Sequence, residues 1–230
     1  MHLVILGATG PTGRALTDQA LAAGHHVTAV ARRAAALPAR PGLTAVAADA
    51  TREGALDAAV AGADAVLSAL GVQPSRAPVS LYSAGIANAV TAMERHGVKR
   101  LLAVSSAVLD PAWRPSGEFF FNNVLDPYVN RVVARAAHED MRRMEALLAD
   151  STLDWTVVRP SGLFDHSGVT AYRTAPESAD GLYTARVDLA AAMLRETEEN
   201  AHLRAAMGVV TVDTRPGLLK LLRDEVLRKR

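Results

Sequence analysis

The chain has 230 residues, of which 50% are hydrophobic, and it carries a formal net charge of +1 with no cysteine. This size fits one domain with an ample apolar core, and the near-neutral charge gives no electrostatic basis for binding nucleic acid or an anionic membrane. The absence of cysteine excludes disulfides, thiolate metal ligands and cysteine nucleophiles. No apolar run approaches the roughly 20 residues that cross a bilayer, and no cleavable leader is recognisable. We therefore expect a soluble, cytoplasmic protein.

The first element is an apolar strand that runs into a glycine-rich turn. Leu3–Leu6 is followed by Gly7, Gly10 and Gly13, and then by the helix formers of Arg14–Ala23. Gly7 lets the chain leave the strand with unusual backbone angles. Gly10 lets backbone N–H groups approach a phosphate, and Gly13 lets the helix pack closely on the strand.

The start of this helix favours anion binding. Its free N–H groups and positive dipole end attract a phosphate, and two threonine hydroxyls add further donors. A strand, a glycine turn and a helix in this order form the context that a dinucleotide-binding fingerprint requires, whereas the alternative is a plain glycine-rich turn. The predicted cofactor-binding residues of this segment are Gly7, Thr9, Gly10, Pro11, Thr12 and Gly13.

Strand and helix patterns then alternate along most of the chain. The predicted strands are Leu3–Leu6, His26–Ala31, Leu43–Ala47, Ala65–Ala69, Arg100–Ser105 and Trp155–Arg159. The predicted helices are Arg14–Ala23, Arg52–Ala61, Ser80–His96, Arg131–Ala149 and Val187–Glu196. Several strands are continuous apolar runs, as in a sheet that is covered on both faces. The pattern predicts a Rossmann-type, doubly wound parallel α/β sheet with helices on both faces, in a single domain.

The last third of the chain is less regular. Residues 161–185 are rich in Gly, Ser, Thr and Pro, and we expect them to form substrate-side loops over the carboxyl ends of the strands, where ligands bind. Residues 215–230 are expected to form a C-terminal helix, with an amphipathic pattern over Leu218–Arg230. Its basic residues alternate with acidic ones, which is typical of a solvated helix face.

The end of the second predicted strand indicates which dinucleotide binds. A carboxylate there would bind the ribose of NAD, but the strand ends in Arg32 and Arg33, and arginine pairs well with the 2′-phosphate of NADP. We expect NADP(H) as cofactor, with Arg32 as the first candidate; two ordinary surface arginines are the alternative. Asp49 follows the third strand, where it can accept from the adenine amino group. Alternatively, Asp49 or Thr51 caps the helix expected near Arg52.

The ends of the fourth and fifth predicted strands supply further candidates. Ala69, Leu70 and Gly71 follow the fourth strand, and small residues there leave room for the cofactor at the sheet edge. Ser105 and Ser106 follow the fifth strand. They can orient the nicotinamide carboxamide or the hydride acceptor by hydrogen bonding, or they can simply end the strand.

With these residues in place, the sequence resembles the atypical members of the short-chain dehydrogenase/reductase superfamily. Residues 7–13 look like their GATGxxG signature, and residues 98–106 are similar to their fifth strand and its serine. Residues 154–160 resemble their sixth strand, which implies that Arg159 and Pro160 lie near the nicotinamide. The nearest group within the superfamily is the NAD(P)H-binding proteins related to biliverdin-IXβ reductase and flavin reductase, whose pocket serine Ser106 matches.

Two positions depart from this resemblance. The superfamily's usual catalytic pair is Tyr-x-x-x-Lys, but the corresponding places hold Ala137 and Met141, and the nearby Tyr128–Val132 segment also lacks the lysine. The pocket histidine of the biliverdin group falls on Gly162. These departures disfavour alcohol dehydrogenation by the common mechanism and put tetrapyrrole reduction in doubt.

The resulting hypothesis is an NADPH-dependent oxidoreductase that transfers hydride to a flat conjugated acceptor of the flavin or quinone type. Solvent can protonate such an acceptor. Ser106 and Ser105 are the candidate catalytic residues, and no metal is expected. The alternatives are an NAD(P)-binding regulatory or sensor protein without turnover, or a biosynthetic isomerase, dehydratase or cyclase. The expected partner is a small-molecule substrate, with no nucleic acid and no membrane, and the chain is expected to be a monomer or small homo-oligomer.

Three further segments have open roles. His166 lies in the expected substrate-side loops, where it either donates a proton or is an ordinary loop histidine. The side chains of residues 138–140 point in different directions on a helix, and we interpret them as a solvated helix start. The three phenylalanines of residues 119–121 form an apolar lid or pack against the core or a partner subunit.

Overall fold

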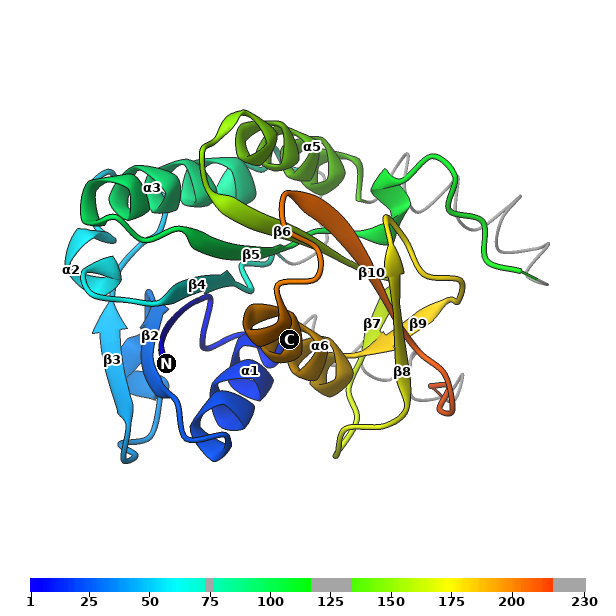
Figure 1. Cartoon of the computed structure of the whole chain (residues 1–230), viewed down its shortest axis with the longest axis horizontal. Coiled ribbons are helices and arrows are strands. Elements are labelled where there is room, and N and C mark those ends of the chain that lie inside the picture. The colour runs from blue at the N-terminus through cyan, green and yellow to red at the C-terminus, as the bar shows by residue number, and fades with distance from the viewer. Residues whose placement is uncertain (73–76, 117–133, 217–230) are drawn as a thin grey trace.

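The fold is built around one large sheet. The computed structural model describes residues 1–72, 77–116 and 134–216, and within them the strand order is β3-β2-β1-β4-β5-β6-β10-β8 (Figure 1). All neighbouring strands are parallel except β10 and β8. The strands are β1 (His2–Leu6), β2 (His26–Ala31), β3 (Leu43–Ala47), β4 (Ala65–Ser68), β5 (Arg100–Val104), β6 (Asp154–Pro160), β8 (Tyr172–Pro176) and β10 (Ala205–Thr211).

Helices cover both faces of this sheet. Helices α3 and α5 pack together on one face, and α1 and α6 pack together on the other. Their bounds, with those of the short helices, are α1 (Pro11–Ala22), η1 (Ala34–Ala36), α2 (Asp57–Val60), α3 (Leu81–His96), η2 (Ala107–Leu109), α5 (Arg135–Asp150) and α6 (Arg186–Glu199). The predicted doubly wound Rossmann-type sheet is therefore confirmed, with one antiparallel strand at its edge.

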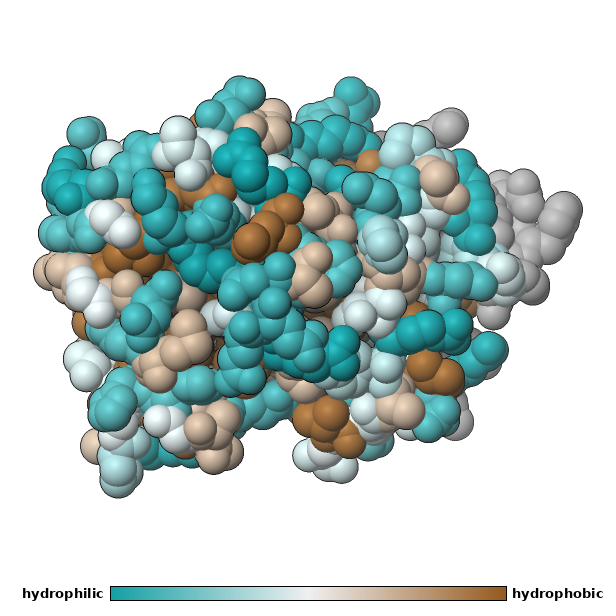
Figure 2. Space-filling view, viewed as in Figure 1, coloured by the Kyte–Doolittle hydropathy of each residue, from teal (hydrophilic) through white to brown (hydrophobic). Residues whose placement is uncertain are grey.

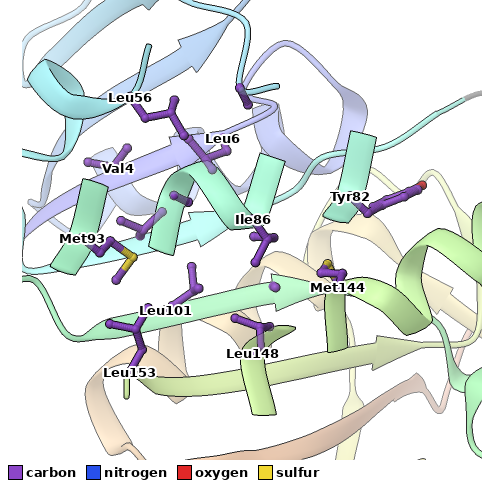
Figure 3. Packing of buried hydrophobic residues seen from close by; sticks show 14 of the residues in the cluster. Val4, Leu6, Leu56, Tyr82, Ile86, Met93, Leu101, Met144, Leu148 and Leu153 are labelled. Atoms are coloured by element: carbon purple, nitrogen blue, oxygen red, sulfur yellow. The ribbon is translucent and has the colours of Figure 1, made fainter. Parts of the chain in front are cut away.

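Two apolar cores result from the alternation of side chains along the strands. On β1, Val4 and Leu6 point toward α3 and α5, whereas Leu3 and Ile5 point toward α1 and α6. Figure 3 shows the first core, in which strand residues such as Leu6 lie opposite Ile86 of α3. β1 and β4 are buried on both faces, and the strand order reverses between them. In open α/β sheets, ligands bind at the carboxyl ends of the strands at such a point.

The predicted helix Arg52–Ala61 is much shorter in the structure. Residues 51–56 form turns, and the helix α2 covers only Asp57–Val60. Gly54 has a φ of 72°, which lies in the left-handed region and interrupts a right-handed helix. Neither Asp49 nor Thr51 therefore caps a helix at Arg52.

The substrate-side segment contains strands that the sequence pattern did not predict. Within residues 161–185, β8 joins the main sheet, and β7 (Gly162–Phe164) pairs in parallel with β9 (Tyr183–Ala185). Strand β10 was also missed, although Ala205–Thr211 is nearly all apolar. Its central Gly208 weakens the strand pattern, because glycine has low strand propensity.

The start of α5 is not the solvated surface that its sequence suggested. Asp140 is fully buried and His138 is 8% exposed. The Asp140 carboxylate accepts hydrogen bonds from the Tyr82 amide at 2.8 Å and from the amide and hydroxyl of Ser83. An acid from α5 therefore caps the N-terminus of α3.

The visible surface is mainly polar. Figure 2 shows hydrophilic side chains over most of this face, with small separate apolar spots, and the large exposed apolar residues are scattered along the chain. Among the described helices, none has the length and hydropathy of a membrane span. Residues 119–121, which were expected to form a lid or to pack against the core or a partner, and residues 218–230, which were expected to form a C-terminal helix, lie outside the described residues.

Candidate functional site: a dinucleotide cradle and a polar chain beside it

The turn after β1 is packed so closely that two of its glycines leave no room for a side chain. Gly7 has a φ of 77°, and a Cβ on it would lie 2.6 Å from the carbonyl oxygen of Ala69. A Cβ on Gly13 would lie 2.2 Å from the carbonyl oxygen of Gly7. The Gly10 amide donates to that same oxygen at 2.9 Å. The turn, the start of α1 and the end of β4 therefore form one tight cradle, with the predicted residues of both strand ends side by side.

The start of α1 fits an anionic group. Gly10 precedes the helix and Pro11 is its first residue. The first amide to bond back along the helix is that of Arg14, which donates to Gly10 at 2.9 Å. The amides of Thr12 and Gly13 precede this bond and are therefore among the free donors of a helix N-terminus, where phosphates bind.

The carboxyl end of β2 lies directly beside this cradle. The Gly7 amide donates to the carbonyl oxygen of Val30 at 3.0 Å, and the exposed Arg32 and Arg33 follow β2. Asp49 lies beyond β3, where its Oδ1 accepts from the Thr51 hydroxyl at 2.7 Å and from the Thr51 amide at 3.0 Å. The predicted phosphate-binding and adenosine-binding residues therefore share one edge of the sheet.

At the other end of this edge, a chain of polar side chains joins β5, α5 and β6. The Ser105 hydroxyl donates to Glu145 Oε1 at 2.6 Å. Arg159 donates from Nη2 to Glu145 Oε2 at 2.7 Å and from Nε to Oε1 at 3.2 Å. Its Nη1 donates to Glu177 at 2.8 Å. Ser105 and Arg159, which the sequence placed near the nicotinamide, are thus linked through Glu145.

Both carboxylates that bind Arg159 keep it charged. Burial acts to lower the pKa of Arg159, but the hydrogen bonds and charge of Glu145, with a further contribution from Glu177, outweigh it and raise the pKa above its usual value. Glu177 has a φ of 61°, a left-handed conformation that costs free energy in a residue other than glycine. This conformation occurs where Glu177 reaches Arg159.

A wall of irregular backbone covers the sheet next to this chain. The carboxylate of Asp110 accepts from the Ser178 hydroxyl, which is the main reason why the pKa of Asp110 is lowered. The indole of Trp113 donates to the Ala179 carbonyl at 3.1 Å. A Cβ on Gly208 would lie 2.1 Å from the Ala179 amide, so only glycine lets this segment cross β10 so closely.

Other candidates have different surroundings. Ser106 is partly exposed and precedes η2, and within the described residues its hydroxyl makes no hydrogen bond. His166 forms a local turn, with its Nδ1 2.7 Å from the Gly168 carbonyl oxygen. The described residues contain no cluster of three or more side chains that could bind a metal.

Glu145, Glu177 and Asp110 were not predicted as site residues. Each reaches the site through contacts between segments that are distant in the sequence. The only local signal was that Glu145 lies four residues after Met141 on one face of a helix.

A comparison of the sequence with known protein families agrees with this geometry. Residues 7–200 match the NAD(P)H-binding family. The chain belongs to this family. The expectation of an NAD(P)H cofactor is thereby confirmed, and the family match includes both the glycine cradle and the Ser105–Glu145–Arg159 chain.

Solved structures share the fold over nearly the whole chain. A short-chain dehydrogenase/reductase from Veillonella parvula, in complex with NADP, has 21% identity and a TM-score of 0.77, covering 94% of this chain and 96% of that one. The anaerobilin reductase ChuY from Escherichia coli O157:H7 has 20% identity and a TM-score of 0.72, covering 94% and 100%. The oxidoreductase ylbE from Lactococcus lactis has 20% identity and a TM-score of 0.72, covering 99% and 97%. The resemblance to atypical short-chain dehydrogenases/reductases is confirmed at the level of fold.

Proposed function

We propose that this protein is an NADPH-dependent reductase that transfers hydride to a flat conjugated acceptor of the flavin or quinone type and takes the accompanying proton from solvent. Its cofactor site comprises the predicted residues of the glycine turn, Arg32, Arg33, Asp49, residues 69–71, Ser105, Arg159 and Pro160. The acceptor lies on the side of residues 161–185. The family match and the glycine cradle support this assignment.

One observation carries the choice of acceptor. The polar side chains at the ends of β5 and β6, Ser105 and Arg159, both donate hydrogen bonds to Glu145 of α5. The single hydroxyl proton of Ser105 is donated to Glu145, and both Glu145 oxygens accept from Arg159. Because a serine hydroxyl has only one proton to donate, Ser105 is occupied as a hydrogen-bond donor.

The residues of α5 support the same conclusion. Ala137 and Met141, at the places where the superfamily's tyrosine and lysine are expected, pack with the apolar core. Within the described part of α5, no tyrosine or lysine replaces them. A substrate that needs a protein side chain as its general acid is therefore disfavoured, whereas a flavin or quinone can take its proton from water.

Each remaining residue has a role in this scheme. When bound, NADPH supplies the hydride, so that the acceptor gains two electrons and, with one proton from water, is fully reduced. The free amides at the start of α1 bind the pyrophosphate. Arg159 and Glu145 hold Ser105 in place, and the Ser106 hydroxyl donates to an oxygen of the acceptor or of the nicotinamide carboxamide.

As part of the same proposal, the protein is located in the cytoplasm and is a monomer or a small homo-oligomer. NADP rather than NAD is favoured by the two arginines after β2 and by the absence of an acid directly after that strand.

The test is steady-state oxidation of NADPH with a panel of flavins and quinones. We expect turnover with at least one acceptor, and we expect Ser106→Ala to lower kcat/KM about tenfold, the effect of losing one hydrogen bond of about 1.4 kcal/mol in the transition state. Thr91→Ala, which removes an exposed hydroxyl on α3, is the matched control. Tight NADPH binding without oxidation in the presence of any acceptor would refute the reductase and favour a binding protein.

A further inference from the structure

The ends of β2 and β3 bring two arginines toward one carboxylate. The amide of Ala48 donates to the carbonyl of Ala31 at 3.2 Å, so the two strands stay paired up to the residue before Arg32. The chain then turns, and the Arg52 amide donates to the Asp49 carbonyl at 3.0 Å. Arg32 therefore directly follows β2, and Arg52 lies in the turn after β3, three residues beyond Asp49.

Asp49 is held as an ionised hydrogen-bond acceptor. The Thr51 hydroxyl and amide both donate to its Oδ1. These hydrogen bonds, followed by the charges of Arg32 and Arg52, lower the pKa of Asp49 below its usual value. Its negative charge therefore opposes an anion that binds at this surface near neutral pH.

The two guanidinium groups are available to a ligand. Arg32 and Arg52 are exposed, and within the described residues neither side chain makes a hydrogen bond or an ion pair. They lie at the same edge as the phosphate turn, because the Gly7 amide is bonded to Val30 of β2 at 3.0 Å. A nucleotide in the glycine cradle would thus have its adenosine half within this neighbourhood.

The local charges indicate how many arginines a phosphate monoester needs here. A phosphate monoester carries about −1.5 to −2 charges at pH 7. The positive charge of Arg32 alone is balanced by Asp49 and gives no net attraction. The two arginines together, less the one carboxylate, leave one net positive charge for the phosphate.

We propose that Arg52 is a second 2′-phosphate-binding residue that acts with Arg32, and that Asp49 weakens the same interaction by opposing the phosphate. This inference rests on the NADP preference proposed above, and it names a specificity-determining pair of which Arg32 directly follows β2 and Arg52 lies in the turn after β3.

The experiment compares two fragments that differ only in the 2′-phosphate. Dissociation constants of 2′,5′-ADP and 5′-ADP are measured by calorimetry on the full chain, and their ratio isolates the phosphate from adenine contacts, which both fragments share. The variants are Arg52→Gln, Arg32→Gln, Asp49→Asn and the double variant Arg52→Gln/Asp49→Asn. Lys99→Gln serves as the control, because it removes an equal charge at the amino ends of the strands, away from the cofactor site. Thermal unfolding of each variant checks that it is folded.

We expect the wild type to prefer 2′,5′-ADP and Arg52→Gln to reduce this preference about tenfold, as for one charge-assisted hydrogen bond. Asp49→Asn should increase the preference about two- to fivefold, as for one exposed charge. The double variant should recover part of the loss and end about two- to fivefold below the wild type, because Arg32 then faces the phosphate without an opposing carboxylate. Lys99→Gln should leave the preference unchanged.

Two outcomes would overturn this inference alone: an unchanged ratio in Arg52→Gln while Arg32→Gln abolishes the preference, or a lower ratio in Asp49→Asn. A wild type without any preference for 2′,5′-ADP would instead refute the NADP preference, and the inference with it. None of these readouts depends on turnover, so the reductase proposal is tested separately.

Discussion

The second and third glycines of the turn, Gly10 and Gly13, should have different effects when each is replaced by alanine. In Gly13→Ala, the new Cβ would lie 2.2 Å from the Gly7 carbonyl oxygen and 2.8 Å from Ala8 Cα, both backbone atoms. In Gly10→Ala, the nearest atom would be 3.3 Å away. The first substitution therefore forces α1 away from β1, whereas the second fits with a shift of a few tenths of an ångström.

The magnitude for Gly13 follows from this overlap. Overpacking costs about 1–3 kcal/mol, and a clash between backbone atoms belongs at the upper end of that range. Replacing a helical glycine with alanine otherwise stabilises by about 0.5–1 kcal/mol. The net loss is therefore about 2 kcal/mol, which lowers Tm by about 4–8 °C in a chain of this size. Gly10→Ala, at an ordinary φ of −71°, should change Tm by less than about 2 °C.

The affinity for NADPH should distinguish the two variants in a different way from Tm. Gly10→Ala should lose affinity while it keeps its Tm, because the added methyl group obstructs the approach of the phosphates. Calorimetric Tm values and NADPH titrations on both variants are the assay. A Gly13→Ala variant with wild-type Tm, or a Gly10→Ala variant with wild-type affinity, would refute the division of roles between the two glycines.

Three further predictions concern buried polar groups. Glu196→Ala should destabilise the fold by about 3–5 kcal/mol in urea unfolding, because it removes the buried carboxylate that pairs with Arg100 at 3.0 Å and leaves that cation without its counter-charge in the interior; a loss below about 1 kcal/mol would contradict this. Asp140→Ala should cost about 1–3 kcal/mol by uncapping α3, whereas the neighbouring Glu139→Ala should cost less than about 0.5 kcal/mol, and equal losses would refute the cap. Burial lowers the pKa of His138 from 6.5, so the stability that it contributes is present above pH 6.5 and is lost as the pH falls through the folded-state pKa. His138→Gln should therefore reduce the fall in unfolding free energy between pH 7.5 and 5.5, and an undiminished fall would show that other groups cause it.

The sequence was informative where function depends on neighbours in the chain. Gly7, Gly10 and Gly13 are adjacent to the strand and helix that they join, so their spacing alone predicts the cradle. Continuous apolar runs likewise predict β1 to β6 nearly to the residue. The same local reasoning failed at Gly54, whose left-handed conformation replaced a predicted helix with a turn.

Contacts between distant segments could not be predicted in this way. The bond between Ser105 and Glu145 joins residues 40 positions apart, and that between Arg159 and Glu177 forms only because β8 reverses direction. Asp140 was interpreted as solvated because nothing in its own helix indicates the N-terminus of α3. A single sequence contains the chemical types of these residues, but their partners follow from topology.

The crossing of residues 178–180 over Gly208 lies apart from the glycine turn, and each of the two places depends on its own close backbone contact. At the glycine turn, Gly7 and Gly13 leave no room for a side chain, because a Cβ on either would lie against the backbone of Ala69 or of Gly7 itself. Over β10, irregular backbone is held by the hydrogen bonds from the Ser178 hydroxyl to Asp110 and from the Trp113 indole to the Ala179 carbonyl. The wall and the glycine cradle share none of the contacts described above, so we expect substitutions at residues 178–180 to leave the packing of Gly7 and Gly13 unaltered.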